Sequence, residues 1–262
     1  MVSHKKSNKK QFVILISALI IGIALGVTLC AFKFNSLKIT NIANNDISAN
    51  TTEVAPVAEK VVAPSFDKTK FSTADPSSIW VVVNKQHPLS SVDFVPSDLI
   101  TTNGATISSK AVDDFEAMLA AAATESITLT ATSSYRSYDT QSKLYNGYIA
   151  EHGQAVADTF SAKPGYSEHQ TGFAIDFTSI YEPICNFDDC FSDAIDGAWL
   201  TAHASDYGFI LRYTAEKQSI TGYKAESWHY RYIGRELATE MKKQSITTLE
   251  EFFNVTGGEI YL

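Results

Sequence analysis

The stretch that decides the fold runs from Pro164 to Asp176 and reads Pro-Gly-Tyr-Ser-Glu-His-Gln-Thr-Gly-Phe-Ala-Ile-Asp. A second motif, Glu226-Ser-Trp-His229, follows further along the chain. Together the two motifs carry two histidines, two glutamates and an aspartate, which are side chains that bind divalent metals or transfer protons in hydrolases. A lone histidine or aspartate in a strand is more often structural, but this combination predicts the two halves of one zinc hydrolase site.

Three residues of these motifs are the predicted zinc ligands. A catalytic zinc takes three protein ligands and keeps one position open for water. His169 and Asp176 suit a turn followed by a short strand, and Gly172 allows the backbone to bend between them. The third ligand has to come from another segment of the chain, and His229 is the best candidate.

Two further residues are predicted to act on the substrate. Glu226 lies shortly before His229 and is the candidate general base. Arg136 follows a predicted strand and is expected to stabilise negative charge on a carbonyl oxygen or to hold a carboxylate in a two-pronged grip. Glu168 is expected to point away from the metal, toward residues behind the ligands or toward solvent.

The remaining pattern predicts an α+β domain with a small sheet flanked by helices, because strands and helices mix without a regular alternation and without a repeat. Short apolar or alternating runs predict strands at 79–83, 127–133, 173–177, 209–213 and 228–232. Helical spacing of apolar residues predicts helices at 111–123, from near 141 to Gly153, at 155–160, from near 199 to Gly208, and at 234–243.

The N-terminal part predicts a membrane anchor. Residues 12–32 carry no charge and are long enough to cross a bilayer core of about 30 Å. The lysines of residues 1–11 predict that this segment is cytoplasmic and that the rest of the chain is outside. A cleaved signal peptide is the alternative, although the apolar run exceeds a usual signal core. Lipid attachment at Cys30 is disfavoured by the bulky Leu29 beside it.

Residues 33–76 predict an extracytoplasmic linker, because they are rich in small and polar residues and lack a sustained period. This leaves 77–262 as the predicted zinc peptidase domain. The net charge of the whole chain is −8, although residues 1–11 are basic. The exterior part is therefore more acidic still, which argues against a nucleic-acid partner. In an exported domain, Cys185 and Cys190 predict a disulfide that closes a small loop; a second metal site is the alternative, but no Cys or His lies nearby.

The motif Ser167-x-His169-x-x-Gly172-x-Ala174-x-Asp176, with Glu226-x-Trp228-His229, resembles the LAS metallopeptidases, which include lysostaphin, D-Ala-D-Ala peptidases and the hedgehog signalling domain. Within this superfamily the chain is similar to the VanY-type D-alanyl-D-alanine carboxypeptidases. Further matching stretches lie at 83–89, 134–138, 207–213 and 220–223, so the resemblance covers about residues 79–236. One departure is Ser227, where the family is associated with proline.

The resemblance implies a small mixed or antiparallel sheet and a zinc-dependent D,D-carboxypeptidase. The implied substrate is the D-Ala-D-Ala end of peptidoglycan stem peptides, from which the terminal D-Ala is removed. The residues that it implies are Zn²⁺ ligands at His169, Asp176 and His229, a base at Glu226, a carbonyl-binding Arg136, and substrate contacts at Gln141 and Ser167.

Several related functions stay open at this point. The same site could serve an L,D-peptidase, a D,D-dipeptidase or an endopeptidase that cuts cross-links, because the pocket beyond the metal decides among them. A catalytically silent wall-binding domain is a further alternative, which Glu226 disfavours because a binding protein has no need of a base. The predicted anchor would hold any of these close to the cell wall.

Overall fold

The computed structural model describes residues 65–262. The predicted cytoplasmic segment at 1–11, the predicted membrane span at 12–32 and most of the predicted linker at 33–76 lie outside the described residues. Within 65–262, no helix is both long enough and apolar enough to cross a bilayer.

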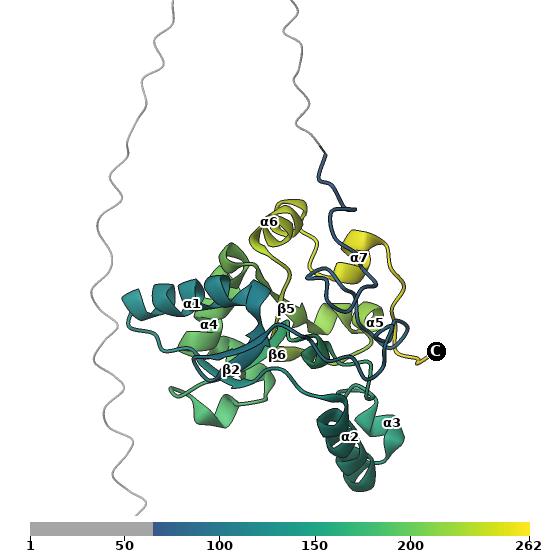
Figure 1. Ribbon diagram of the computed structural model, residues 1–262. Coiled ribbons are helices and arrows are strands. Elements are labelled where there is room, and N and C mark those ends of the chain that lie inside the picture. The colour runs from purple at the N-terminus through teal and green to yellow at the C-terminus, as the bar shows by residue number, and fades with distance from the viewer. Residues whose placement is uncertain (1–64) are drawn as a thin grey trace, which may run out of the picture. The chain divides into compact units, whose positions relative to one another are not determined.

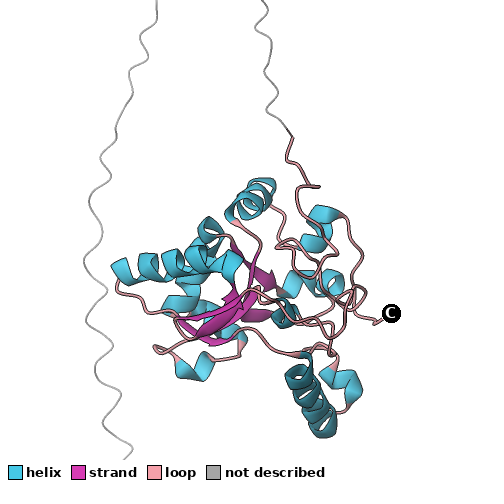
Figure 2. Ribbon diagram, in the orientation of Figure 1, coloured by secondary structure: helices cyan, strands magenta, loops and turns pink. Residues whose placement is uncertain are grey.

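The centre of the domain is a four-stranded sheet in the order β3-β4-β6-β5 (Figure 2). All three strand pairs are antiparallel, which confirms the α+β prediction and selects the antiparallel form of the sheet. The strands are β3 (Thr130–Ser133), β4 (Ala174–Thr178), β5 (Phe209–Tyr213) and β6 (Glu226–Tyr232). A separate hairpin, β1 (Leu99–Thr102) with β2 (Ala105–Ser108), was not predicted.

Helix α1 (Ser109–Thr124) supplies the main apolar layer against this sheet. Ser108 caps it, because its hydroxyl accepts a hydrogen bond from the Lys110 amide. The fully buried Phe115 lies 6.4 Å, between ring centroids, from both Phe177 on β4 and Phe209 on β5. The predicted helix at 111–123 is therefore confirmed and forms one wall of the core.

Among the other helices, α2 and α3 lie side by side, below the sheet in this view (Figure 1). The α-helices are α2 (Tyr138–His152), α3 (Gln154–Ala157), α4 (Ile195–His203), α5 (Gln218–Thr221), α6 (Arg235–Gln244) and α7 (Leu249–Phe253). Short 3-10 helices form η1 (Glu168–Thr171), η2 (Pro183–Cys185), η3 (Asp189–Asp193), η4 (Ala204–Tyr207) and η5 (Ala215–Lys217). Gly153 and Gly208 end helices as predicted, each with φ of 80°.

The predicted strand at 79–83 is wrong. This segment is buried but forms no strand. The guanidinium group of Arg231 donates hydrogen bonds to the carbonyls of Ile79 and Val81, at 3.0 and 2.9 Å. Because a side chain satisfies these carbonyls, the apolar run can be buried without a neighbouring strand.

Other boundaries also differ from the sequence prediction, and the strand predicted at 127–133 begins only at Thr130. Phe66 and Phe71, which the prediction assigned to the linker, pack on Trp80 with ring centroids 5.6 and 5.0 Å away. The folded part therefore includes residues 65–76. The predicted loop from 179 to 195 contains η2 and η3, and the predicted disulfide between Cys185 and Cys190 is present.

Candidate metal centre

Strand pairing brings the first two predicted ligands together. Asp176 on β4 and His229 on β6 are direct partners across the antiparallel pair. Partner residues in such a pair have their side chains on the same face of the sheet. The Nδ1 atom of His229 lies 3.2 Å from Oδ1 of Asp176, and both side chains are buried.

The third predicted ligand, His169, comes from helix η1, immediately before β4. Gly172 ends η1 in the left-handed conformation, with φ of 74°, and so lets the chain turn from His169 into the strand. The Nε2 atom of His169 lies 3.2 Å from Oδ2 of Asp176. Its Nδ1 lies 2.7 Å from the carbonyl of Ser134, which therefore accepts the ring proton and leaves Nε2 free to bind a cation.

The three side chains fit a divalent metal. Their ligand atoms lie within 4.8 Å of one another, and the two imidazole centroids are 4.9 Å apart. Tetrahedral zinc with bonds of about 2.0–2.1 Å separates its ligand atoms by roughly 3.3 Å. Oδ1 of Asp176 is buried and has no hydrogen bond to the described residues, so a cation would supply its missing partner.

Glu226 faces the same group from the start of β6. Its Oε2 lies 3.4 Å from Nδ1 of His229. The register between β5 and β6 shifts between Leu211 and Tyr213, which lets Glu226 and His229 share a face although they are three positions apart. Burial raises the pKa of Glu226 to about 7, so its carboxyl can gain and lose a proton near neutrality.

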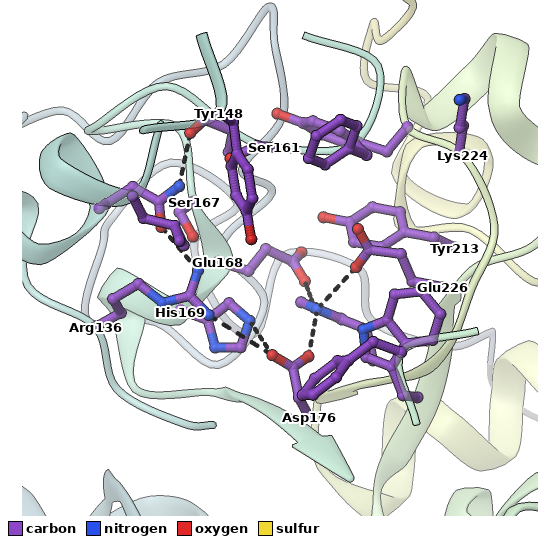
Figure 3. Close-up of a pocket in the computed structure, with 18 of the residues that line it drawn as sticks. Arg136, Tyr148, Ser161, Ser167, Glu168, His169, Asp176, Tyr213, Lys224 and Glu226 are labelled. Carbon is purple, nitrogen blue, oxygen red and sulfur yellow. Dashed lines mark hydrogen bonds and ion pairs between the residues drawn. The ribbon is translucent and has the colours of Figure 1, made fainter. Parts of the chain in front are cut away.

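Arg136 lies on the opposite side of Asp176 from Glu226 (Figure 3). One of its amino groups, Nη2, lies 3.6 Å from Oδ2 of Asp176 and donates to the Ser133 hydroxyl at 2.8 Å. Its other amino group, Nη1, donates to the Gln141 side-chain oxygen at 2.8 Å. The amide nitrogen of Gln141 donates in turn to the Ala162 carbonyl at 2.7 Å. Gln141 therefore uses both ends of its amide within the protein and holds Arg136 in place.

All seven predicted site residues line one cavity of about 460 Å³. Ser167, the last of them, is buried at the start of η1. This cavity also has aromatic walls. They are formed by Tyr148, Phe160, Phe187, Tyr213, Tyr223 and Trp228.

Glu168 was expected either behind the ligands or toward solvent. It is fully buried, so it does not face solvent. Its Oε1 accepts hydrogen bonds from Arg212 and Arg231, both at 2.8 Å. Arg212 also pairs with Glu250, at 2.7 and 2.9 Å. Burial opposes the charge on Glu168, but the two guanidinium groups outweigh it and hold its pKa below the usual range. The only sequence signal for this network is the presence of an arginine within each of two strands.

Glu168, held by Arg212 and Arg231, also contacts His229. Oε2 of Glu168 lies 3.4 Å from Nε2 of His229, the ring nitrogen that faces away from the metal group. Burial disfavours the charged imidazole, but Asp176 and Glu168 outweigh that effect and raise the pKa of His229 to about 9. When Nε2 donates its proton to Glu168, Nδ1 is left to bind a metal.

An antiparallel sheet that joins two histidines and an aspartate, with a buried glutamate and a fixed arginine beside them, defines a metal-dependent hydrolase. Comparison with known proteins gives the family. Residues 104–235 match the family model VanY, D-alanyl-D-alanine carboxypeptidase, and the chain belongs to this family. The resemblance inferred from the motifs is thereby confirmed.

Individual relatives agree with this assignment. YodJ of Bacillus subtilis (strain 168), which carries a provisional name as a carboxypeptidase, is 36% identical over 189 residues, or 68% of each chain. The LD-carboxypeptidase LdcB has a similar structure, with a TM-score of 0.63 and 36% identity, over 69% of this chain and 88% of LdcB.

Two solved VanY structures contain ligands. VanYB in complex with D-alanine-D-alanine has a TM-score of 0.57 and 30% identity, over 66% of this chain and 96% of VanYB. A variant of the D,D-pentapeptidase VanY from the VanB-type cassette, in complex with Zn(II), has a TM-score of 0.56 and 30% identity, over 66% of this chain and 98% of that one. Together with the His/Asp/His group described above, the second structure supports zinc as the cofactor.

Proposed function

We propose that this protein is a zinc-dependent D,D-carboxypeptidase that removes the terminal D-Ala from peptidoglycan stem peptides. The observation that carries the proposal is the meeting of four side chains in one cavity: His169, Asp176 and His229 as ligands, with Glu226 beside them. Membership of the VanY family and the VanYB complex with D-alanine-D-alanine support the choice of substrate.

The proposed reaction is the hydrolysis of an amide. A bound zinc ion supplies positive charge that acidifies water and polarises a carbonyl oxygen. Glu226 accepts a proton from the water whose oxygen forms the new bond to the scissile carbonyl carbon. When the carbon–nitrogen bond breaks, Glu226 returns this proton to the amine of the leaving D-Ala. Its position 3.4 Å from His229 supports this role, because it places the carboxylate beside the proposed metal position.

Arg136 has a separate role in the proposal. Its guanidinium group is fixed by Ser133 and Gln141 and cannot lose its proton, so it presents a permanent positive charge to the cavity. It engages the scissile carbonyl oxygen or the carboxylate of the leaving D-Ala. Ser167 lines the cavity and contacts the substrate, whereas Gln141 acts through Arg136.

An L,D-carboxypeptidase is the second candidate. One observation favours it: LdcB, an LD-carboxypeptidase, has higher identity and a higher TM-score than VanYB, at 36% and 0.63 against 30% and 0.57. The proposed ligands and base would serve either reaction, because the two substrates differ only in the residue that precedes the scissile bond. The metal group alone does not separate these reactions from those of a D,D-dipeptidase or an endopeptidase, whereas the buried base Glu226 disfavours a silent wall-binding protein.

We also propose that the enzyme is a single-pass membrane protein, with residues 1–11 in the cytoplasm and the domain outside. The uncharged run at 12–32 and the lysines before it support this topology. The disulfide between Cys185 and Cys190 is consistent with an oxidising compartment outside the cytoplasm.

The experiment that tests the activity uses the purified full-length chain and two defined peptides. One is a stem pentapeptide that ends in D-Ala-D-Ala, and the other is the tetrapeptide that remains after one D-Ala is removed. Mass analysis of the products is expected to show conversion of the pentapeptide to the tetrapeptide, and a chelator is expected to abolish it. Conversion of the tetrapeptide to a tripeptide, with the pentapeptide intact, would favour the L,D reaction. If the Glu226→Ala variant bound zinc and acted at the parent rate, the assignment of the base would be wrong.

A further inference from the structure

One wall of the cavity comes from a short loop that the proposed mechanism does not use. Residues 185–190, here called the disulfide loop, are closed by the bond between Cys185 and Cys190. Phe187 lies within this loop and lines the same cavity as the metal group. The loop therefore connects a covalent constraint to a surface that substrate can reach.

Side-chain hydrogen bonds attach the loop to both strands that carry predicted ligands. The side-chain oxygen of Asn186 accepts a hydrogen bond, at 2.7 Å, from the amide of Ser179, the residue after β4. The hydroxyl of Ser227, within β6, donates to the Asp188 carbonyl at 3.0 Å. Ser227 stands where the family is associated with proline, which has no hydroxyl to donate. The position of the disulfide loop is thus fixed relative to β4 and β6.

The backbone of Phe187 is strained, and the burial of its ring does not explain the strain. Its φ of 59° lies in the left-handed region, which bulky residues rarely adopt. The residue is 51% exposed, and its ring packs edge-on against Trp228 with centroids 5.9 Å apart. A strained residue that remains half-exposed at a cavity points to a role in that cavity.

The order of groups across the site indicates which part of a substrate Phe187 faces. Arg136 approaches Oδ2 of Asp176, whereas His229 and Glu226 lie on the Oδ1 side (Figure 3). Trp228, on which Phe187 packs, precedes His229 on β6. Of the two contacts proposed above for Arg136, the one with the carboxylate of the leaving D-Ala places the carboxyl end of the substrate beside this residue. The residue on the amino side of the scissile bond then extends toward Phe187.

We infer that Phe187 is a specificity-determining residue, whose ring contacts the side chain on the amino side of the scissile bond. This inference rests on the proposed function. In a peptide that ends in D-Ala-D-Ala, the contacted group is the methyl of the first D-Ala. A peptide that ends in Gly-D-Ala has no such group, so its hydrolysis gains nothing from Phe187.

The test measures kcat and KM for the release of D-Ala from each of these two peptides. The full-length chain and its variants are measured in the same way. The parent protein is expected to favour the D-Ala-D-Ala peptide by roughly tenfold in kcat/KM, as one methyl group in an apolar pocket allows. The variant Phe187→Asn keeps a residue that tolerates positive φ but removes the ring. It is expected to lose most of this preference, chiefly through a higher KM for D-Ala-D-Ala, and Phe187→Tyr is expected to keep it.

A matched control and a loop variant complete the design. Ile184 is adjacent to the disulfide loop and 88% exposed, and it does not line the cavity. Ile184→Ala is therefore expected to leave both peptides unaffected. Replacement of Cys185 and Cys190 together by serine is expected to lower the preference in the same direction as Phe187→Asn, with zinc content unchanged.

The outcomes separate the inference from the proposed function. If Phe187→Asn releases D-Ala with the full parent preference, Phe187 does not determine specificity, although the proposed function stands. If the double serine variant keeps the full preference, the disulfide does not position Phe187. If the parent protein releases D-Ala from neither peptide, the proposed function fails and the inference fails with it.

Discussion

The carboxylate of Glu168 lies 3.4 Å from Nε2 of His229, on the side of the ring that faces away from Asp176. Arg212 and Arg231 fix that carboxylate from behind. The orientation of a proposed ligand is thus set by a charged network that has no access to solvent. Groups of this kind hold a metal-binding imidazole in one tautomer and one direction.

Glu168→Gln is expected to weaken zinc binding by about 10–100-fold, because the amide is a poorer acceptor for the imidazole N–H. The change also leaves buried guanidinium charge unpaired, so it lowers the free energy of unfolding by about 3–5 kcal/mol. Competition with a chelator, on protein that remains folded by circular dichroism, measures the affinity. The control is Glu251→Gln, which weakens a partly exposed pair with Lys217 and a hydrogen bond from the Thr248 hydroxyl, at a position that does not line the cavity. Equal zinc affinity in both variants would show that Glu168 does not support His229.

Gln141 and Arg136 are expected to behave as one unit. Arg136→Ala should lower kcat/KM by about 10²–10³-fold, because it removes the fixed charge that engages the scissile carbonyl oxygen or the carboxylate of the leaving D-Ala. Gln141→Ala should lower kcat by a smaller factor with little change in KM, because it only loosens Arg136. Steady-state kinetics separate the two roles of Gln141. A higher KM at unchanged kcat would instead support the direct substrate contact that the family resemblance implied.

Zinc binding is expected to release a proton from His229. Asp176 and Glu168 raise the pKa of this imidazole from its ordinary value of 6.5 to about 9. Below about pH 9 the metal-free ring is therefore charged, and zinc has to displace its proton. Zinc affinity should rise with pH through the neutral range and level off near 9.

Calorimetry in two buffers of different ionisation enthalpy checks this prediction, and near neutral pH about one proton should leave per zinc ion. The stability of the metal-free protein, in contrast, should fall as the pH rises. The stabilisation that the charged ring provides is complete below pH 6.5 and is lost as the pH rises through about 9. An affinity for zinc that does not change with pH would contradict the assignment of His229 as a ligand.

Gly172→Ala is expected to destabilise the domain by about 1–3 kcal/mol. The residue has φ of 74°, and an added Cβ would lie 3.0 Å from Leu99 Cδ2 and 3.1 Å from the Ser108 nitrogen. Gly147→Ala is the matched control, because it lies within α2 with nothing inside 4 Å and should stabilise the helix by about 0.5–1 kcal/mol. Urea unfolding measures both changes. Equal effects of the two substitutions would contradict a requirement for glycine at 172.

The local parts of the site could be predicted from sequence because spacing alone constrains them. His169, Gly172 and Asp176 lie within one turn and one short strand, and His229 follows Glu226 closely. The β1–β2 hairpin also has a local signal in the sequence. The Asn103-Gly104 pair, with φ of 46° and 83°, is typical of a tight hairpin turn.

The remaining features depend on contacts between distant segments, which no periodicity reveals. Residues 79–83 read as a strand because they are apolar and β-branched, yet the Arg231 side chain satisfies two of their carbonyls. The Glu168 network requires Arg212 and Arg231 to meet it from two other strands. Gln141 could be placed at the site by resemblance, but its bond to Ala162 became visible only in the structure.

The most direct test of the central claim is anomalous diffraction at the zinc absorption edge from crystals of the purified protein. The account predicts one strong peak, at about 2.0–2.1 Å from both His169 Nε2 and His229 Nδ1 and in contact with a carboxylate oxygen of Asp176. A zinc-loaded crystal with no peak among these three residues, or with zinc bound elsewhere, would contradict it.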